Sequence, residues 1–320
     1  MDAFNSLIGR SPNFEALLRS ARIIAATDVT ILITGETGTG KEVIANALQR
    51  HSSRANKPFV TLNCAALPES IAESELFGHC KGAFTGAVSN QTGRLQSAHT
   101  GTLFLDEVDS LTLALQAKLL RFLETGECQP VGQTRTQNVD VRIIAASNSC
   151  LEDKIAAGEF RQDLFFRLNV VPLQIPPLRE RSGDVDHLVK YFVNYFSKKH
   201  RLDAPGFSKA AMDLLRSYSW PGNIRELRNL CERLLILLPG QTLEMSNIPQ
   251  EIHARYRYSG MESQTGFALP ESGIDMEALE IDLINQALAR TNGNRSKAAR
   301  LLGMSRDTLL YRIHKYGIPA

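Results

Sequence analysis

The feature that most constrains this chain is a glycine-rich heptapeptide near its start, Gly35–Lys41 (GETGTGK). It follows a short β-branched run, Val29–Thr34, which predicts a buried strand, and it precedes a predicted helix from Lys41 to about Arg50. In that setting glycines let backbone N–H groups converge on a phosphate, the helix N-terminus adds partial positive charge, and the lysine adds a full charge. The sequence therefore predicts a nucleotide phosphate site made by Gly35, Glu36, Thr37, Gly38, Thr39, Gly40, Lys41 and Glu42.

Two adjacent acids, Asp106 and Glu107, follow an apolar run that predicts a strand at 102–105. Taken alone such a pair is compatible with surface acids, but next to a phosphate loop it has a chemical use. One carboxylate can hold Mg²⁺ and the other can orient and deprotonate an attacking water. We assign Asp106 to the metal and Glu107 to the water. Because Glu42 replaces the usual hydroxyl after the lysine, we expect the metal to depend more on Asp106 and water.

Strands and helices alternate along the first half of the chain. Such alternation predicts a mostly parallel sheet covered on both faces, that is, an α/β fold. After Pro176-Pro177 the strand pattern ends and three helices follow, at 184–200, 208–218 and 222–238, which we interpret as a helical lid. The expected organisation is an α/β ATPase subdomain (1–176), an α-helical lid (177–240), a linker (241–273) and a small all-α helix-turn-helix domain (274–320). The other expected elements are helices at 12–26, 111–125 and 275–290, a helix-turn-helix over 294–315, and strands at 58–62, 139–146 and 170–175.

Two asparagines stand where predicted strands end, Asn63 after 58–62 and Asn148 after 139–146. Isolated asparagines are more often turn residues. Because parallel strands end at one edge of a sheet, we expect both side chains near the phosphates. Asn148 could reach the γ-phosphate or the water, and Asn63 could hold Glu107 in a standby position.

The last thirty residues are basic, with six Lys or Arg and one Asp, although the whole chain carries only +2. A helix at 296–302, a turn at Gly303 and an N-cap at Ser305 predict a helix-turn-helix. Periodicity alone would also fit a plain helical hairpin, but the basic excess favours double-stranded DNA. The second helix turns Leu309, Leu310 and Ile313 inward, and helix 275–290 is expected to form a dimer seam. The candidate DNA-binding residues are Arg295, Lys297, Ser305, Arg306, Thr308, Tyr311, Arg312 and Lys315.

Composition narrows the class of protein. No apolar run approaches the roughly 20 residues of a membrane span, and the N-terminus lacks the pattern of a secretory signal. Five widely spaced cysteines without a CxxC pair fit a reducing cytoplasm better than a disulfide framework or a zinc site. We therefore expect a cytoplasmic protein with no membrane partner.

Six segments occur in one order: GETGTGKE, GAFTGA, GTLFLDE, FRQDLFFRLNV, PPLRER and WPGNIRELRN. Over about residues 7–240 the chain thereby resembles the AAA+ domain of the activators of sigma-54 RNA polymerase, and its tail resembles their Fis-type helix-turn-helix. The resemblance implies ATP and Mg²⁺ as cofactors and a ring, expected to be hexameric. Three details depart from the family pattern: Cys80 where an acid is common, Ser147 where Thr is usual, and Gly132-Gln133 where a second Gly is frequent in the neighbouring loop.

The resemblance also implies roles for single residues. Arg161 and Arg167 match arginine fingers that reach the γ-phosphate of a neighbouring subunit, although sequence alone would favour a salt-bridged helix for them. Arg225 matches the sensor II arginine of the lid, Asn63 the glutamate-switch asparagine, and Asn148 sensor I. The loop that contacts sigma-54 would be Gly82, Ala83, Phe84, Thr85, Gly86 and Ala87, with Phe84 and Thr85 most directly involved.

Three functions stay open at this point: an ATP-driven activator of sigma-54 polymerase, a conventional DNA-binding regulator whose ATPase-like domain only senses or oligomerises, and another AAA+ machine such as an unfoldase or DNA-junction motor. The first accounts for the ATPase motifs, the loop and the tail together. Because the match begins near residue 7, we expect no N-terminal sensor domain. Either the chain is trimmed, or control comes from expression level or from a separate protein acting in trans.

Overall fold

A computed structural model describes residues 4, 7–66, 68–84, 86–253, 275–291 and 293–318. The chain divides into two compact units, residues 1–256 and 257–320, which are described separately. Within the described residues, no helix has both the length and the apolar character needed to cross a membrane.

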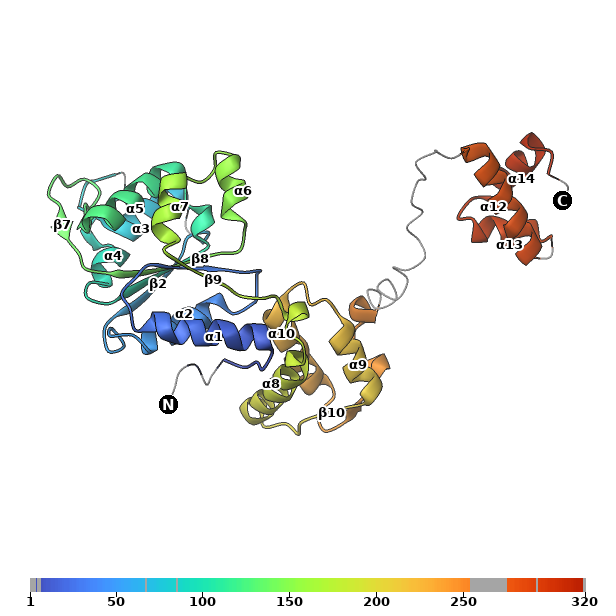
Figure 1. The fold of residues 1–320 in the computed structure, drawn as a ribbon, viewed down its shortest axis with the longest axis horizontal. Helices are drawn as coiled ribbons and strands as arrows, with labels where there is room; N and C mark the ends of the chain where they lie inside the picture. The colour runs from blue at the N-terminus through green and yellow to red at the C-terminus, as the bar shows by residue number, and fades with distance from the viewer. Residues whose placement is uncertain are drawn as a thin grey trace. The chain divides into compact units, whose positions relative to one another are not determined.

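The first unit is built on a five-stranded sheet whose neighbouring strands are all parallel (Figure 1). In spatial order the strands are β2 (Phe59–Asn63), β5 (Thr102–Asp106), β8 (Arg142–Ser147), β1 (Ile31–Thr34) and β9 (Val171–Gln174). The register pairs Asn63 with Asp106 and Thr34 with Ser147. The carboxyl ends of four strands therefore meet at one edge, where an α/β sheet binds its ligands.

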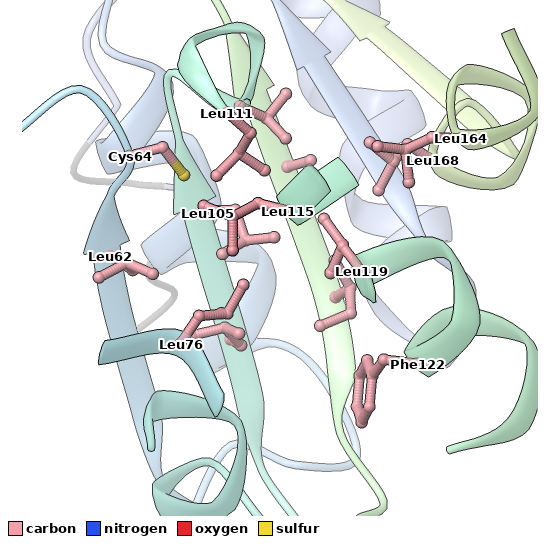
Figure 2. Close-up of a cluster of buried hydrophobic side chains, with 14 of the residues drawn as sticks. Leu62, Cys64, Leu76, Leu105, Leu111, Leu115, Leu119, Phe122, Leu164 and Leu168 are labelled. Carbon is pink, nitrogen blue, oxygen red and sulfur yellow. The ribbon is translucent and has the colours of Figure 1, made fainter. Parts of the chain in front are cut away.

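Alternating side chains along each strand bury the two faces of this sheet separately. On one face Ile31, Ile33 and Phe104 pack with helices α1 (Pro12–Ala25) and α2 (Lys41–Arg50). The other face is shown in Figure 2, where Leu105 lies beside Leu115 of α5 (Leu113–Thr125). Leu62 and Leu119 belong to the same buried cluster. Because both faces are covered, the three central strands β1, β5 and β8 are almost entirely buried, and the expected α/β fold is confirmed.

Smaller elements complete this subdomain around the second face. They are α3 (Glu69–Phe77), α4 (Arg94–Ser97), α6 (Leu151–Ala156), α7 (Gln162–Leu168), the 3₁₀ turn η2 (Val108–Ser110) and two antiparallel hairpins, β3 (Gly78–His79) with β4 (Gln91–Thr92) and β6 (Glu127–Cys128) with β7 (Gln137–Asn138). The strand expected at 139–146 begins later, at Arg142, because the chain just before it pairs with β6 and Val139 N donates to Gly126 O.

The lid follows β9 and has its own core around Trp220, which is fully buried and donates through Nε1 to Leu215 O at 2.9 Å. Its elements are η3 (Leu178–Glu180), α8 (Asp184–His200), β10 (Gly206–Phe207), α9 (Lys209–Ser217), α10 (Asn223–Leu237), β11 (Thr242–Leu243) and η4 (Met245–Asn247). Leu243, Ile248 and Ile252 belong to the same core, and β11 pairs with β10. The start of the expected linker, 241–253, is thus part of the lid; the rest, 254–273, lies outside the described residues.

The second unit holds three helices, α12 (Met276–Arg290), α13 (Arg295–Leu301) and α14 (Arg306–Lys315). Asn294 and Ser305 cap α13 and α14 by accepting from Lys297 N and Thr308 N, both at 3.1 Å. Gly303 adopts a left-handed φ of 67° between the two helices, a conformation that glycine takes without strain. The expected helix-turn-helix is confirmed, with Leu309 and Ile313 in its core and Leu310 partly buried.

Candidate nucleotide-binding and DNA-binding sites

The phosphate loop connects β1 to α2 and has the backbone geometry that an anion site requires. Gly38 and Gly40 have φ values of 81° and 100°, which turn successive N–H groups toward the helix start. Lys41 is largely buried, and its Nζ donates to the carbonyls of Gly35 at 2.8 Å and Glu36 at 3.3 Å. Thr39 Oγ1 donates to Glu36 O at 2.8 Å, whereas Glu42 points to solvent as an exposed residue.

The acidic pair stands at the carboxyl edge of the sheet beside this loop. Glu107 has a left-handed φ of 53°, an uncommon conformation for a residue with a side chain and one that collects at functional sites. Asn148 bridges the two parts of the site, because its Nδ2 lies 3.5 Å from Glu107 Oε1 and 3.4 Å from Thr37 Oγ1. Asn63 sits beside Asp106 in the register, but its Oδ1 accepts from Ala66 N at 3.0 Å.

Burial in this pocket disfavours the charged forms of both Lys41 and Asp106. Burial lowers the pKa of the Lys41 ammonium, and the nearby carboxylates of Asp106, Glu107 and Asp109 partly oppose that shift. Burial likewise raises the pKa of Asp106, which Lys41 partly opposes. A polyanion would stabilise the ammonium and a divalent cation would stabilise the carboxylate, so the pocket suits a nucleotide triphosphate with its metal.

The lid is fastened directly onto the tip of the phosphate loop. Arg179 of η3 makes a two-point ion pair with Glu36, at 2.6 and 2.9 Å. Asn223, fully buried at the start of α10, donates to Glu36 Oε2 at 3.0 Å and Thr37 O at 3.1 Å, and accepts from Leu178 N at 2.8 Å. A Cβ at Gly38 would lie 2.2 Å from Gly222 O, so only glycine permits this approach.

The expected sensor arginine lies at the same contact. Arg225 N donates to Gly38 O at 3.3 Å, and its positive charge reaches both Lys41 and Asp106. A cavity of about 460 Å³ opens beside it, lined by Thr37 and by lid residues that include Gly222 and Glu226.

Arg161 is the N-cap residue of α7 and Arg167 lies within that helix, and both are exposed. Arg161 pairs with Asp163, two residues away, at 2.7 and 3.0 Å, and Arg167 donates to Leu123 O at 3.0 and 3.2 Å. Both sets of bonds are solvent-exposed, so both guanidinium groups can be released to a ligand at modest cost.

The described residues of the GAFTGA segment, Gly82–Phe84 and Gly86–Ala87, lie in the connection between β3 and β4. Gly82 N donates to Ala87 O at 2.8 Å, and the Phe84 ring, 38% exposed, meets the His79 ring at a centroid distance of 5.0 Å. A Cβ at Gly132 would come within 2.7 Å of Ala83 Cβ, which shows how closely the neighbouring loop supports this one. Thr85 lies outside the described residues.

In the tail, seven of the candidate DNA-binding residues are exposed on or next to the two helices of the helix-turn-helix: Arg295, Lys297, Ser305, Arg306, Thr308, Tyr311 and Lys315. Arg312 behaves differently, because it forms a short ion pair with Glu280 of α12, and Tyr316 Oη donates to the same carboxylate at 2.7 Å. Arg312 therefore ties α14 to α12.

Sequence reasoning missed three residues that the structure brings to the nucleotide site: Arg179, Asn223 and Asp109. Arg179 and Asn223 lie in the PPLRER and WPGNIRELRN segments, so the sequence marked both as part of family motifs. It gave no sign that both residues contact the phosphate loop. Asp109 follows the acidic pair by two residues and resembles a surface acid in sequence, yet its side chain is only 8% exposed.

Comparison with known proteins covers almost the whole chain. The model of the Sigma-54 interaction domain matches residues 7–174, that of the AAA+ ATPase lid domain 179–265, and that of the Fis family of bacterial regulatory proteins 275–316. The chain is 45% identical over 313 residues to the transcriptional regulatory protein ZraR of Klebsiella oxytoca, covering 97% of this chain and 68% of that protein. It is 42% identical over 338 residues to the DNA-binding transcriptional regulator NtrC of Rhizobium meliloti, covering 98% and 70%.

Solved structures agree. NtrX from Brucella abortus in complex with ATP superposes with a TM-score of 0.71 at 36% identity, covering 98% of this chain and 69% of that one. A RuvB mutant from Thermotoga maritima reaches a TM-score of 0.50 at 15% identity, covering 100% of this chain and 92% of that one, which reflects the shared fold alone. The chain belongs to the sigma-54-dependent transcriptional activators, with an AAA+ ATPase domain that drives sigma-54-dependent transcription and a Fis-type helix-turn-helix that binds DNA.

Proposed function

We propose that Lys41, Asp106, Glu107 and Asn148 carry out ATP hydrolysis in this activator. The main support is that these side chains meet at one edge of the sheet. Asn148 lies within 3.5 Å of both Glu107 and Thr37, and Lys41 is the first residue of α2. Lys41 and the loop N–H groups would bind the β- and γ-phosphates, while Glu107 deprotonates water that Asn148 helps to orient. Asn63, free to exchange its bond with Ala66 N, is proposed as a second partner of Glu107 in another nucleotide state.

The residues present fit a magnesium ion. Mg²⁺ prefers one or two carboxylates together with substrate phosphates and water. Asp106, at the end of β5 and half-buried, supplies such a carboxylate, and the described residues contain no cluster of three or more ligands that could hold a metal without phosphates. The ion would neutralise charge developing on the phosphates.

Arg161 and Arg167 are proposed to act on the nucleotide of a neighbouring subunit. Both are exposed and held by solvent-exposed bonds, which is what a finger acting in trans requires. The consequence is a ring, proposed as hexameric, in which hydrolysis depends on assembly. Arg225 would couple the lid to the nucleotide.

Sigma-54 RNA polymerase is the proposed target of the loop 82–87. Its one large apolar side chain, Phe84, is partly exposed and rests on His79 through an edge contact that a moving hairpin can break. We propose that γ-phosphate contact raises this loop and hydrolysis lowers it.

The tail is proposed to bind an upstream activating sequence with α14 in the major groove. Arg306, Thr308 and Tyr311 would face base edges, and Arg295, Lys297 and Lys315 would face phosphates; Ser305 caps the helix. Because Arg312 pairs with Glu280, its role is proposed to be mainly structural. Exposed Met276 and Leu283 on α12 support a dimer through this domain. A cytoplasmic location follows from these partners, and a separate protein acting in trans remains a proposed source of control.

The test is Glu107→Gln in the full chain, with transcription from a sigma-54 promoter as the readout. We expect ATP binding to persist, turnover to fall by at least about 100-fold and open complexes to disappear. Wild-type levels of open complex in this variant would instead favour a conventional regulator that needs no hydrolysis.

A further inference from the structure

The turn that carries Glu107 is anchored by a side chain that the catalytic scheme does not use. Asp109 lies in η2, two residues after Glu107, and its side chain is only 8% exposed. Its Oδ1 accepts from Ser147 Oγ at 3.0 Å and its Oδ2 accepts from Ser149 Oγ at 2.8 Å. Each carboxylate oxygen is thus bonded by one of the two hydroxyls that flank Asn148.

The serines are also tied to each other. Ser147, at the end of β8, is fully buried, and its single hydroxyl proton is shared between Asp109 Oδ1 and Ser149 O, each 3.0 Å from Oγ. Ser149 N donates to Ser147 Oγ at 3.2 Å. This closes a tight turn around Asn148, which itself faces outward as an exposed residue. Hydrogen bonds to a charged, buried acceptor are stronger than those between neutral groups, so Asp109 is a firm anchor for this turn.

The backbone conformation of Glu107 is one that needs support from neighbouring contacts. A left-handed φ of 53° in a residue with a Cβ persists only when surrounding contacts hold it there. Ser110 N donates to Glu107 O at 2.9 Å within the turn, and Lys154 Nζ donates to Asp109 O at 3.3 Å from α6. Asp109 is the point at which this strained turn is bonded to the end of β8.

We propose that Asp109, with Ser147 and Ser149, is a positioning residue that keeps Glu107 and Asn148 in register across the nucleotide. The proposal rests on the catalytic roles assigned to those two side chains. It predicts that loss of the anchor slows the chemical step without weakening ATP binding, because Lys41 and the loop glycines are untouched.

The experiment measures kcat and KM for ATP on assembled full-length protein carrying Ser149→Ala, Asp109→Ala or both. Because a displacement of about 1 Å can cost roughly 100-fold, we expect kcat to fall about 10- to 100-fold while KM stays within about twofold. The double variant should be no slower than Asp109→Ala, since both remove one coupled unit. Ser149→Thr, which keeps the hydroxyl, should recover most of the rate.

Two controls keep the result interpretable. Ser197→Ala in the lid removes a comparable hydroxyl bond, to Leu202 O at 2.6 Å, and should leave kcat unchanged. In an Asn148→Ala background, Ser149→Ala should add less than about a twofold loss, because its effect passes through Asn148. Retained binding of a fluorescent ATP analogue would show that each variant is folded.

The possible outcomes distinguish the positioning role of Asp109 from the catalytic roles proposed for Glu107 and Asn148. If Glu107→Gln abolishes turnover but folded Ser149→Ala and Asp109→Ala keep the wild-type kcat, the positioning role is overturned while the catalytic assignment stands. If Asp109→Ala raises KM and lowers kcat alike, Asp109 supports the pocket as a whole and the proposal is also overturned. If Glu107→Gln itself turns over ATP normally, the catalytic assignment fails first.

Discussion

The nucleotide site and the helix-turn-helix of this protein are assembled in opposite ways. At the nucleotide site, the bond from Asn223 to Glu36 joins residues 187 positions apart, and that from Asn148 to Thr37 joins residues 111 apart. In the tail, the capping bonds of Ser305 to Thr308 and Asn294 to Lys297 each span three residues. The geometry of a site made from distant segments requires the whole domain to be folded. The geometry of a site on capped helices is set mainly by hydrogen bonds between residues close in sequence.

The largest expected effect tests whether the nucleotide site includes a residue from a neighbouring subunit. Arg161→Ala should lower ATP turnover by roughly 1000-fold, because an arginine finger stabilises charge on the transferred phosphoryl group. Mixing this variant with Lys41→Ala, which keeps its own Arg161 but cannot bind ATP, should restore part of the turnover. No restoration across a range of mixing ratios would show that Arg161 acts within its own subunit.

The next prediction concerns the long-range contact between Asn223 and the phosphate loop. Asn223→Gly removes the amide while tolerating the left-handed φ of 50°, so backbone strain does not confuse the result. Losing its two buried donors to the phosphate loop should weaken ATP binding by about 10-fold, measured with a fluorescent nucleotide. Asn194→Ala, on the exposed side of α8, is the matched control and should bind ATP normally.

A smaller effect tests the independence of the tail. Lys297→Ala in the full chain should lower DNA affinity several-fold at all sequences and reduce the slope of log K against log salt by about one. Turnover of ATP at saturating protein should not change. A similar loss of ATP turnover in this variant would show that the helix-turn-helix and the nucleotide site are functionally coupled.

The smallest effect concerns the surface ion pair that helps to hold the lid. Hydrogen bonding from Arg179, and then from Asn223, keeps the pKa of Glu36 below its usual value. A lowered carboxyl pKa contributes stability above the ordinary pKa, and this is lost as the pH falls through the lowered one. The pair is about 40% exposed, so Glu36→Gln should cost at most about 1 kcal/mol at pH 7.

Thermal unfolding as a function of pH measures this contribution. The difference in Tm between wild type and Glu36→Gln should shrink toward zero as the solution is made acidic below the usual carboxyl range. A difference that persists unchanged at low pH would mean that Glu36 acts through packing and its amide partner rather than through its charge.

The elements expected from sequence were mostly those with a strong local signal. The helices at 12–26, 184–200 and 275–290 are found as α1, α8 and α12 within a residue or two, because periodic apolar residues and capping residues mark them. Strand β8 was misplaced at its start and α3 was not foreseen. In both places the chain is organised by partners elsewhere, such as the β6–β7 hairpin, and a short local pattern carries no sign of them.

The sequence by itself determined the kind of chemistry: a phosphate loop, an acidic pair at a strand end and a basic helix-turn-helix, each carried by adjacent residues. Only the tertiary structure decided which side chains meet. It joined Glu36 to Arg179 and Asn223, it bonded Asp109 to the two serines beside Asn148, and it turned Arg312 toward Glu280. The physical reason is that such bonds form between segments whose distance is set by the packing of the sheet and lid, and no spacing along the chain records that distance.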